Sequence, residues 1–409
     1  MKVYKVLLCL FITIFSYILP VYADDEDFEN FSDISSIINA SSEIVTVPTI
    51  NSRAAIVYDR SSGTILFGKN ENEKRKMAST TKIMTAIILV ENVSDLSKEI
   101  EVVKEAAMVG GSSLELKTGD KITYEGLLYG LLLCSGNDAA AQIAISMAGS
   151  IEEFADLMNA KAYSLGLKDT HFITPHGLDE EGHYTTAYEL AVIADYALNM
   201  QKIAEVVSTK NYTIAVNGYP RALTNTNELL GYLEGVNGVK TGFTHNAGRC
   251  LVTSAIRDNF NIITVVLGAD TKKIRTRDSI NLIEYVYKNY KLINLEDRVE
   301  EAYQNWKLVN ENRIEITKGI PTSKIEVKLG KIKYTKYPIR KESLENINID
   351  IKTYKLKLNA PVKENYQLAN IIISIDNKEI MRVPIEIKKE IAKKGIKEYI
   401  IETLELLSN

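Results

Sequence analysis

The first two-thirds of the chain mixes strand-like and helix-like hydrophobic patterns. Residues 54–58 and 64–67 are apolar runs separated by a Ser-Ser-Gly turn, which predicts a β-hairpin. Residues 79–92 carry apolar side chains at helical spacing, and 124–148 is rich in Leu, Ala and Ile, so both predict buried helices. Further strands are expected at 239–240, 250–256 and 261–267. The pattern predicts an α/β domain that ends near Asp297.

Beyond that point the pattern changes to an alternation of charged and apolar residues with period two. The stretches with this alternation are 313–316, 324–329 and 354–358. Residues 371–375 and 383–387 with a turn at Asp376-Asn377 predict a hairpin. Together they predict a small all-β module with one solvated face. It holds no cluster of candidate catalytic groups, so we expect a spacing or binding role.

The two ends of the chain differ from both regions. Lys2 and Lys5 precede an apolar run at 6–19, and Val21-Tyr22-Ala23 resembles a signal-peptidase site. An uncleaved membrane anchor is the alternative, but the run is short for a membrane span. At the other end, Ile396, Ile400, Leu404 and Leu407 fall on one helical face. That helix either lies in a membrane interface or packs on its own domain or frays.

These patterns divide the chain into five predicted segments. They are a signal peptide at 1–23, a flexible acidic segment at 24–47, a catalytic domain at 48–297, a β-rich domain at 298–389, and an amphipathic helix at 390–409 that is a candidate membrane anchor. The chain is therefore expected to be exported and to act outside the cytoplasm, with the terminal helix as a candidate for membrane association.

Composition and charge narrow the function classes. Of 409 residues, 45% are hydrophobic and 25% charged, as in a globular protein, and the net charge of -4 argues against nucleic acid as a partner. Cys134 and Cys250 lie in apolar runs and predict buried free thiols. Neither paired cysteines nor a His-Glu-x-x-His motif is present, so no metal or organic cofactor is expected.

Three short motifs carry the chemistry. Ser79 and Lys82 in Ser-Thr-Thr-Lys are one helical turn apart, so a neutral lysine can take the serine proton if burial and nearby cations lower its pKa. Alone, this motif is common by chance. However, Ser135-Gly136-Asn137 and Lys240-Thr241-Gly242 follow in that order, which matches the set known from penicillin-binding proteins and class A β-lactamases.

With these motifs the chain resembles the low-molecular-mass penicillin-binding proteins of the D-alanyl-D-alanine carboxypeptidase family. The resemblance runs over about 54–290 and includes Thr174-Pro175-His176-Gly177-Leu178, 183–187, Asn225-Thr226-Asn227 and 238–244. It implies a β-lactamase/transpeptidase-like domain, in which helices flank an antiparallel sheet and a helical subdomain carries Ser135 and Asn137. The region after that domain resembles the family's C-terminal domain more loosely.

The resemblance also implies roles for individual residues. Ser79 would attack the carbonyl between two terminal D-alanines, with Lys82 as the general base. Ser135 and Asn137 would relay protons and hold the peptide, and Lys240 would supply positive charge beside that network.

The resemblance further implies a substrate-binding set formed by Thr241, Gly242, Phe243 and Arg275. Thr241 would dock the terminal carboxylate, the backbone N–H groups of Ser79 and Phe243 would form the oxyanion hole, and Arg275 would be a second carboxylate-binding cation. Some relatives carry an arginine where this chain has Thr226, which puts the substrate preference in doubt.

The expected function is removal of the terminal D-alanine from peptidoglycan pentapeptides through an acyl-enzyme that β-lactam antibiotics also form. A serine β-lactamase, a DD-endopeptidase and a non-catalytic wall-binding protein of the same fold remain alternatives. A Ser-His-Asp hydrolase is disfavoured, because none of the four histidines lies near a nucleophile elbow: the chain has no Gly-x-Ser-x-Gly motif.

Overall fold

The computed structural model describes residue 38 and residues 46–320 and 325–408. The described chain divides into two compact units. The first, here the catalytic unit, holds the chain up to Tyr58, Phe67–Ile256 and Ile263–Ile283. The second consists of Asp59–Leu66, Arg257–Ile262 and the chain from Glu284 onward, and this last stretch is called the C-terminal domain. The predicted signal peptide lies outside the described residues, as does most of the acidic segment.

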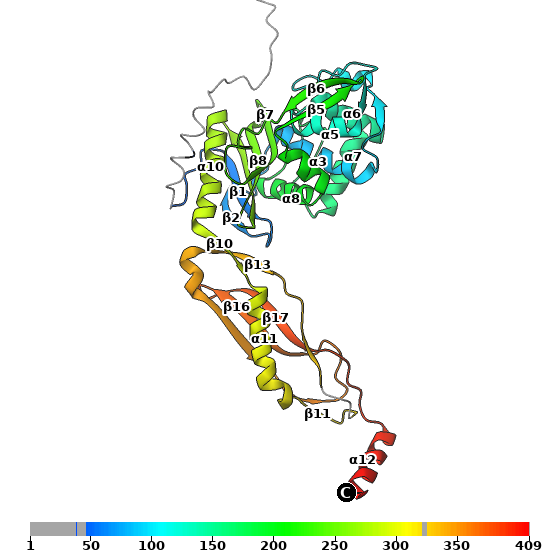
Figure 1. Ribbon diagram of the computed structural model, residues 1–409, viewed down its shortest axis with the longest axis vertical. Helices are drawn as coiled ribbons and strands as arrows, with labels where there is room; N and C mark the ends of the chain where they lie inside the picture. The colour runs from blue at the N-terminus through cyan, green and yellow to red at the C-terminus, as the bar shows by residue number, and fades with distance from the viewer. Residues whose placement is uncertain (1–37, 39–45, 321–324, 409) are drawn as a thin grey trace, which may run out of the picture. The chain divides into compact units, whose positions relative to one another are not determined.

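A five-stranded antiparallel sheet with the order β2-β1-β9-β8-β7 forms the centre of the catalytic unit (Figure 1). Its strands are β1 (Ala54–Asp59), β2 (Ile65–Lys69), β7 (Val236–Thr244), β8 (Gly248–Arg257) and β9 (Phe260–Ala269). The predicted hairpin is confirmed. Strand β7 is longer than the predicted strand at 239–240, so the whole Lys-Thr-Gly motif lies within a strand at the sheet edge.

Helices cover both faces of this sheet. The elements are η1 (Ala78–Thr81), α3 (Lys82–Asn92), α4 (Lys104–Ala107), α5 (Tyr124–Leu132), α6 (Asn137–Ala148), α7 (Ile151–Ser164), α8 (Ala187–Leu198), α9 (Gln201–Ser208) and α10 (Lys272–Asn289), with the small hairpins β3 (Glu99–Glu101)/β4 (Lys121–Thr123) and β5 (Asn211–Val216)/β6 (Tyr219–Thr224). Figure 1 shows α10 on one side of the sheet and the other helices on the opposite side. The predicted fold class is confirmed.

Local sequence signals set the limits of several helices. The Ser150 and Thr186 side chains accept hydrogen bonds from the Glu153 and Glu189 backbone N–H groups, as Ser/Thr-x-x-Glu capping boxes do. Helix α3 lies at the centre of the core, where Ile83, Ile87 and other apolar side chains are buried. Because its first residue, Lys82, is buried too, the helix carries a catalytic candidate into the interior.

The C-terminal domain is rich in β-strands and has its own core. Its elements are β10 (Tyr290–Asn294), α11 (Glu296–Asn310), η2 (Glu311–Arg313), β11 (Glu315–Thr317), β12 (Val327–Leu329), β13 (Lys336–Arg340), η3 (Lys341–Asn346), β14 (Ile347–Thr353), β15 (Lys357–Asn359), β16 (Gln367–Ile375), β17 (Lys378–Ile387) and α12 (Ile396–Ser408). The main sheet has the order β12-β17-β16-β14. The predicted β16–β17 hairpin is confirmed, and Asp376 and Asn377 at its turn both have positive φ.

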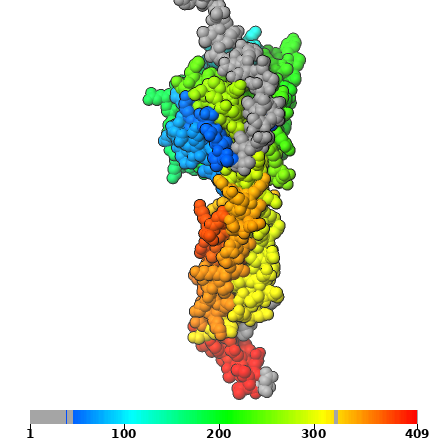
Figure 2. Space-filling model, turned by 90° about the vertical axis from the view of Figure 1, so that its left-hand side faces the viewer, coloured from blue at the N-terminus to red at the C-terminus, as the bar shows by residue number. Residues whose placement is uncertain are grey.

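Helix α11 is a feature that the period-two pattern did not reveal. It packs against the sheet (Figures 1 and 2), and its Val299, Tyr303 and Trp306 side chains belong to the same core as Ile371 and Val383. The Trp306 indole N–H donates to Thr353 Oγ1 at 2.9 Å, so the helix is also held by a polar contact.

The terminal helix α12 leaves its apolar residues in solvent. Ile396, Leu404 and Leu407 are 82%, 60% and 79% exposed. This exposure shows that the apolar face is not packed on the rest of the domain. Within the described part of the chain, no helix is long and apolar enough to cross a membrane.

Candidate active site

The candidate nucleophile sits on a tight turn at the start of the central helix. Ser79 lies in the 3-10 turn η1, which begins at Ala78 with a left-handed φ of 49° and leads directly into α3. The sequence predicted an α-helix from Ser79. The structure differs because Thr80 and Thr81 donate to the Met77 and Ala78 carbonyls, which favours i to i+3 closure.

Two glycines allow other segments to approach this turn. A Cβ on Gly242 would lie 3.0 Å from the Ser79 backbone nitrogen, so strand β7 can pass the turn at this distance only with glycine. A Cβ on Gly177 would lie 2.0 Å from the Ala78 carbonyl oxygen. The glycine of Lys-Thr-Gly is therefore required by the close approach of strand and nucleophile.

Lys82 makes three contacts that define its role. Its Nζ lies 2.9 Å from Ser79 Oγ, 2.7 Å from Asn137 Oδ1 and 2.8 Å from the His176 carbonyl oxygen. The Asn137 amide is oriented by its Nδ2, which donates to the Gly110 carbonyl at 2.7 Å. Two partners of the amine can therefore only accept. A neutral amine has two N–H groups and one lone pair, so in that form Lys82 can donate to Asn137 and His176 and accept the proton of the Ser79 hydroxyl.

Burial favours the neutral form of this amine. Lys82 and Lys240 are both 0% exposed. Desolvation and the charge of Lys240 hold the pKa of Lys82 well below its ordinary value. Desolvation also lowers the pKa of Lys240 to about 7, with a smaller contribution from Arg275. The burial and the neighbouring charge therefore both favour the neutral amine that a lysine base requires.

The second motif lies in the turn between α5 and α6. Ser135 has a left-handed φ of 65°, and Asn137 begins α6 with its backbone N–H donating to the Ser112 carbonyl. The sequence interpretation placed the tight turn at Gly136, but Gly136 has φ -56°. Glycine is favoured at position 136 because of close packing, since a Cβ there would lie 2.9 Å from Asp138 Oδ1 and 3.1 Å from Leu114 Cγ.

An open cavity of about 270 Å³ brings these elements together. It is lined by Ser79, Gly111, Ser112, Ser135, Asn137, Gly177, Leu178, Asp179, Thr226, Thr241, Gly242, Phe243, Thr244 and His245. Six of the predicted site residues therefore face one space, and Lys82 contacts the serine from the interior. The Thr226 and Thr241 hydroxyls lie 2.7 Å apart, so the residue that replaces the arginine of some relatives shares a hydrogen bond with the third motif.

Arg275 lies away from the cavity lining. It is 2% exposed and forms an ion pair with Glu228, which also accepts from the Thr276 hydroxyl. Burial acts to raise the pKa of Glu228, but the charge of Arg275 outweighs this effect and the pKa is lowered. The side chain predicted to bind a carboxylate is thus occupied by an internal one, and its charge acts on the buried Lys240.

Two histidines contact the nucleophile turn and its lysine, His183 through its ring and His176 through its carbonyl oxygen. His183 Nδ1 accepts from the Ile173 backbone N–H at 3.0 Å, so Nε2 carries the proton and donates to Thr81 Oγ1 at 2.8 Å. Burial lowers the pKa of His183 to about 4 and that of His176 to about 3. Only the family-like segments around them pointed to these contacts.

Comparison with known proteins shows the family to which the chain belongs. The D-alanyl-D-alanine carboxypeptidase family profile matches residues 41–271, and the penicillin-binding protein 5 C-terminal domain profile matches residues 303–393. D-alanyl-D-alanine carboxypeptidase DacF of Bacillus subtilis is 32% identical over 86% of this chain and 89% of its own length. The corresponding values for DacC of Escherichia coli are 30%, 87% and 88%.

Solved structures show the same likeness. Penicillin-binding protein 5 from Haemophilus influenzae superposes with a TM-score of 0.71 at 24% identity, covering 86% of this chain and 100% of that one. Streptomyces K15 DD-transpeptidase, in mutant form, reaches 0.57 at 32% identity over 59% of this chain and 100% of its own. With the family profile covering more than half of the chain, the protein belongs to the D-alanyl-D-alanine carboxypeptidase family.

Proposed function

We propose that the protein is a serine D-Ala-D-Ala carboxypeptidase that removes the terminal D-alanine of peptidoglycan stem peptides through an acyl-enzyme on Ser79. The observation that carries the proposal is the position of the buried Lys82 amine, whose Nζ lies 2.9 Å from Ser79 Oγ. No cofactor is needed for this chemistry, since base, nucleophile and proton relay are side chains.

The reaction begins when Lys82 takes the Ser79 proton as Oγ attacks the carbonyl between the two D-alanines. The N–H groups of Ser79 and Phe243 bind the developing oxyanion, a pair of donors that Gly242 allows to lie close together. Ser135 passes the proton to the leaving amine, while Thr241 and Thr226 bind the terminal carboxylate. Water then releases the acyl group from Ser79.

Two of the alternative functions lack support in the cavity. A class A β-lactamase uses a glutamate between the second and third motifs, yet none of Glu152, Glu153, Glu180, Glu181 and Glu189 lines the cavity. Glu189 instead accepts from Thr170 and the Lys168 backbone. A non-catalytic protein has no need for a buried lysine amine 2.9 Å from a serine hydroxyl. Endopeptidase action on cross-links uses the same machinery.

The proposal includes the place of action, which is the outer side of the cytoplasmic membrane or the wall. The basic and apolar N-terminus supports export. The exposed apolar face of α12, with Tyr399 and several lysines nearby, supports attachment to a lipid surface.

The test is intact-mass spectrometry of the purified protein after mixing with penicillin, together with a D-alanine release assay on a D-Ala-D-Ala peptide. We expect a long-lived adduct and D-alanine release, both abolished by Ser79→Ala. Consumption of penicillin without an adduct would instead identify a β-lactamase. Intact penicillin and no D-alanine release would leave only a binding role.

A further inference from the structure

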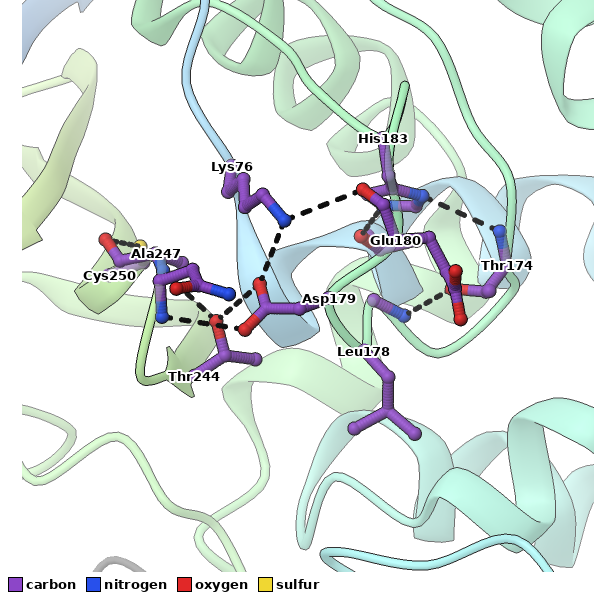
Figure 3. A network of polar contacts seen from close by, with 12 residues as sticks. Lys76, Thr174, Leu178, Asp179, Glu180, His183, Thr244, Ala247 and Cys250 are labelled. Atoms are coloured by element: carbon purple, nitrogen blue, oxygen red, sulfur yellow. Dashed lines mark hydrogen bonds and ion pairs between the residues drawn. The ribbon is translucent and has the colours of Figure 1, made fainter.

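One acidic side chain in the cavity has no part in the reaction described above. Among the described residues that line the cavity, Asp179 is the one carboxylate. It follows Gly177 and Leu178 in the segment that packs on the nucleophile turn, and Figure 3 shows it between Lys76 and Thr244. The cavity therefore has buried lysines near Ser79 and a negative charge elsewhere on its wall.

The contacts of Asp179 hold it in place but leave acceptor sites open. Thr244 Oγ1 donates to Oδ1 at 2.9 Å, and the Asn246 backbone N–H reaches Oδ2 at 3.4 Å. Lys76 Nζ lies 3.7 Å from Oδ1, which is beyond a good hydrogen bond. The Asp179 side chain is 22% exposed. A carboxylate offers about four lone-pair sites, so it can accept a further N–H donor from a ligand.

The register of strand β7 relates Asp179 to the substrate. β7 is an edge strand, and an extended peptide added antiparallel to it runs from the Thr244 end toward the Thr241 end. The peptide carboxylate then lies at Thr241 and upstream residues lie beside Thr244, three residues or roughly 10 Å further along the strand. The peptide backbone from the terminal D-alanine to the residue two positions before it, together with the extended side chain of that residue, spans a distance comparable to these roughly 10 Å.

We propose that Asp179 is a specificity residue that binds the side-chain ammonium of a diamino acid two positions before the terminal D-alanine. The inference rests on the proposed function, since it assumes that the peptide carboxylate docks at Thr241. The cavity then binds both charged ends of a short peptide segment, the carboxylate at Thr241 and the side-chain ammonium at Asp179. Lys76 moderates the attraction because it already neutralises part of the Asp179 charge.

The test compares D-alanine release from Nα-acetyl-L-Lys-D-Ala-D-Ala and from its Nα,Nε-diacetyl form, which lacks the ammonium. For the wild-type protein we expect kcat/KM to be on the order of tenfold higher for the free amine, the factor typical of a partly buried charged hydrogen bond. Asp179→Asn, which keeps an oxygen for Thr244, should bring the ratio to within about twofold of one. Lys76→Met should raise the ratio about two- to threefold, an effect that no loss of structure would produce.

Glu181→Gln is the matched control, because Glu181 is an exposed acid in the same loop but outside the cavity lining. It should leave the ratio unchanged. Equal turnover of both peptides by the wild-type protein would overturn the inference while leaving the carboxypeptidase function intact, as would an unchanged ratio in Asp179→Asn. Failure of the proposed function would show differently, as no D-alanine release from either peptide and no penicillin adduct.

Discussion

The catalytic unit keeps Lys82, Lys240, Arg275 and Glu228 away from water, whereas the buried polar residues in the described part of the C-terminal domain are Ser343 and Asn370. Charges in the C-terminal domain form surface pairs such as Lys388–Glu326, with side chains 51% and 43% exposed. Burying an ionic group costs several kcal/mol, so a fold built only for stability avoids it. The comparison teaches that, in the described residues, buried charge is concentrated in the unit that carries the candidate nucleophile.

Replacing Lys82 with Met should have the largest effect, and on activity rather than stability. Loss of the base should lower the rate of acylation by penicillin about 10³-fold or more. The free energy of unfolding should stay unchanged or rise, because a poorly solvated amine is removed. Acylation rates and thermal unfolding followed by circular dichroism check both parts. A marked fall in stability together with retained acylation would show that buried Lys82 stabilises the fold and is not needed as the base.

Glu228→Gln should instead destabilise the catalytic unit by about 3–5 kcal/mol, since it leaves the buried Arg275 cation without its counter-charge. The double variant Glu228→Gln/Arg275→Met should recover most of the loss. Circular dichroism reports on the whole chain, and fluorescence of the single tryptophan, Trp306, reports on the C-terminal domain. The fluorescence transition should not move. If it shifts as far as the dichroism transition, the two regions unfold together.

Acid should weaken the catalytic unit more than the C-terminal domain. His183 has a folded pKa of about 4 against an ordinary value of 6.5, so the unfolded chain binds a proton in that interval and the folded chain does not. Stability therefore falls as pH drops from 6.5 to 4, by up to about 3 kcal/mol from this residue. All four histidines lie in the catalytic unit. Urea unfolding at several pH values should show a smaller slope for His183→Gln.

The smallest effect is expected for Lys388→Ala in the C-terminal domain. Its ion pair with Glu326 is exposed and screened by water, so the free energy of unfolding should not change measurably. Chemical denaturation followed by Trp306 fluorescence measures it. A clear shift of the unfolding midpoint would mean that surface charge stabilises this domain more than the comparison allows.

Much of the site could be predicted because the motifs impose local geometry. A serine and a lysine one turn apart on a helical segment must lie close, and Lys-Thr-Gly on an edge strand must present a bare backbone. The hairpins at 54–67 and 371–387 likewise follow from turn residues between apolar runs.

Other features depend on contacts between residues far apart in the chain. The pairing of Arg275 with Glu228 and the contact of His183 with Thr81 join different elements, so no local pattern reports them. The left-handed φ of Ser135 is imposed by the turn between two buried helices, where the adjacent glycine drew attention instead. Helix α11 was missed because the strand-like periodicity around it dominated the interpretation of that region.

The exposed edge of a long strand is usually a hazard, because its unpaired N–H and C=O groups can recruit another copy of the chain and start aggregation. Strand β7 has nine residues and lies at such an edge. The turn η1 and helix α9 pack against this strand, and the cavity beside the serine leaves room for a short peptide. A bulkier residue at Gly242 would push the turn η1 away from this strand, so we expect it to lower solubility as well as turnover.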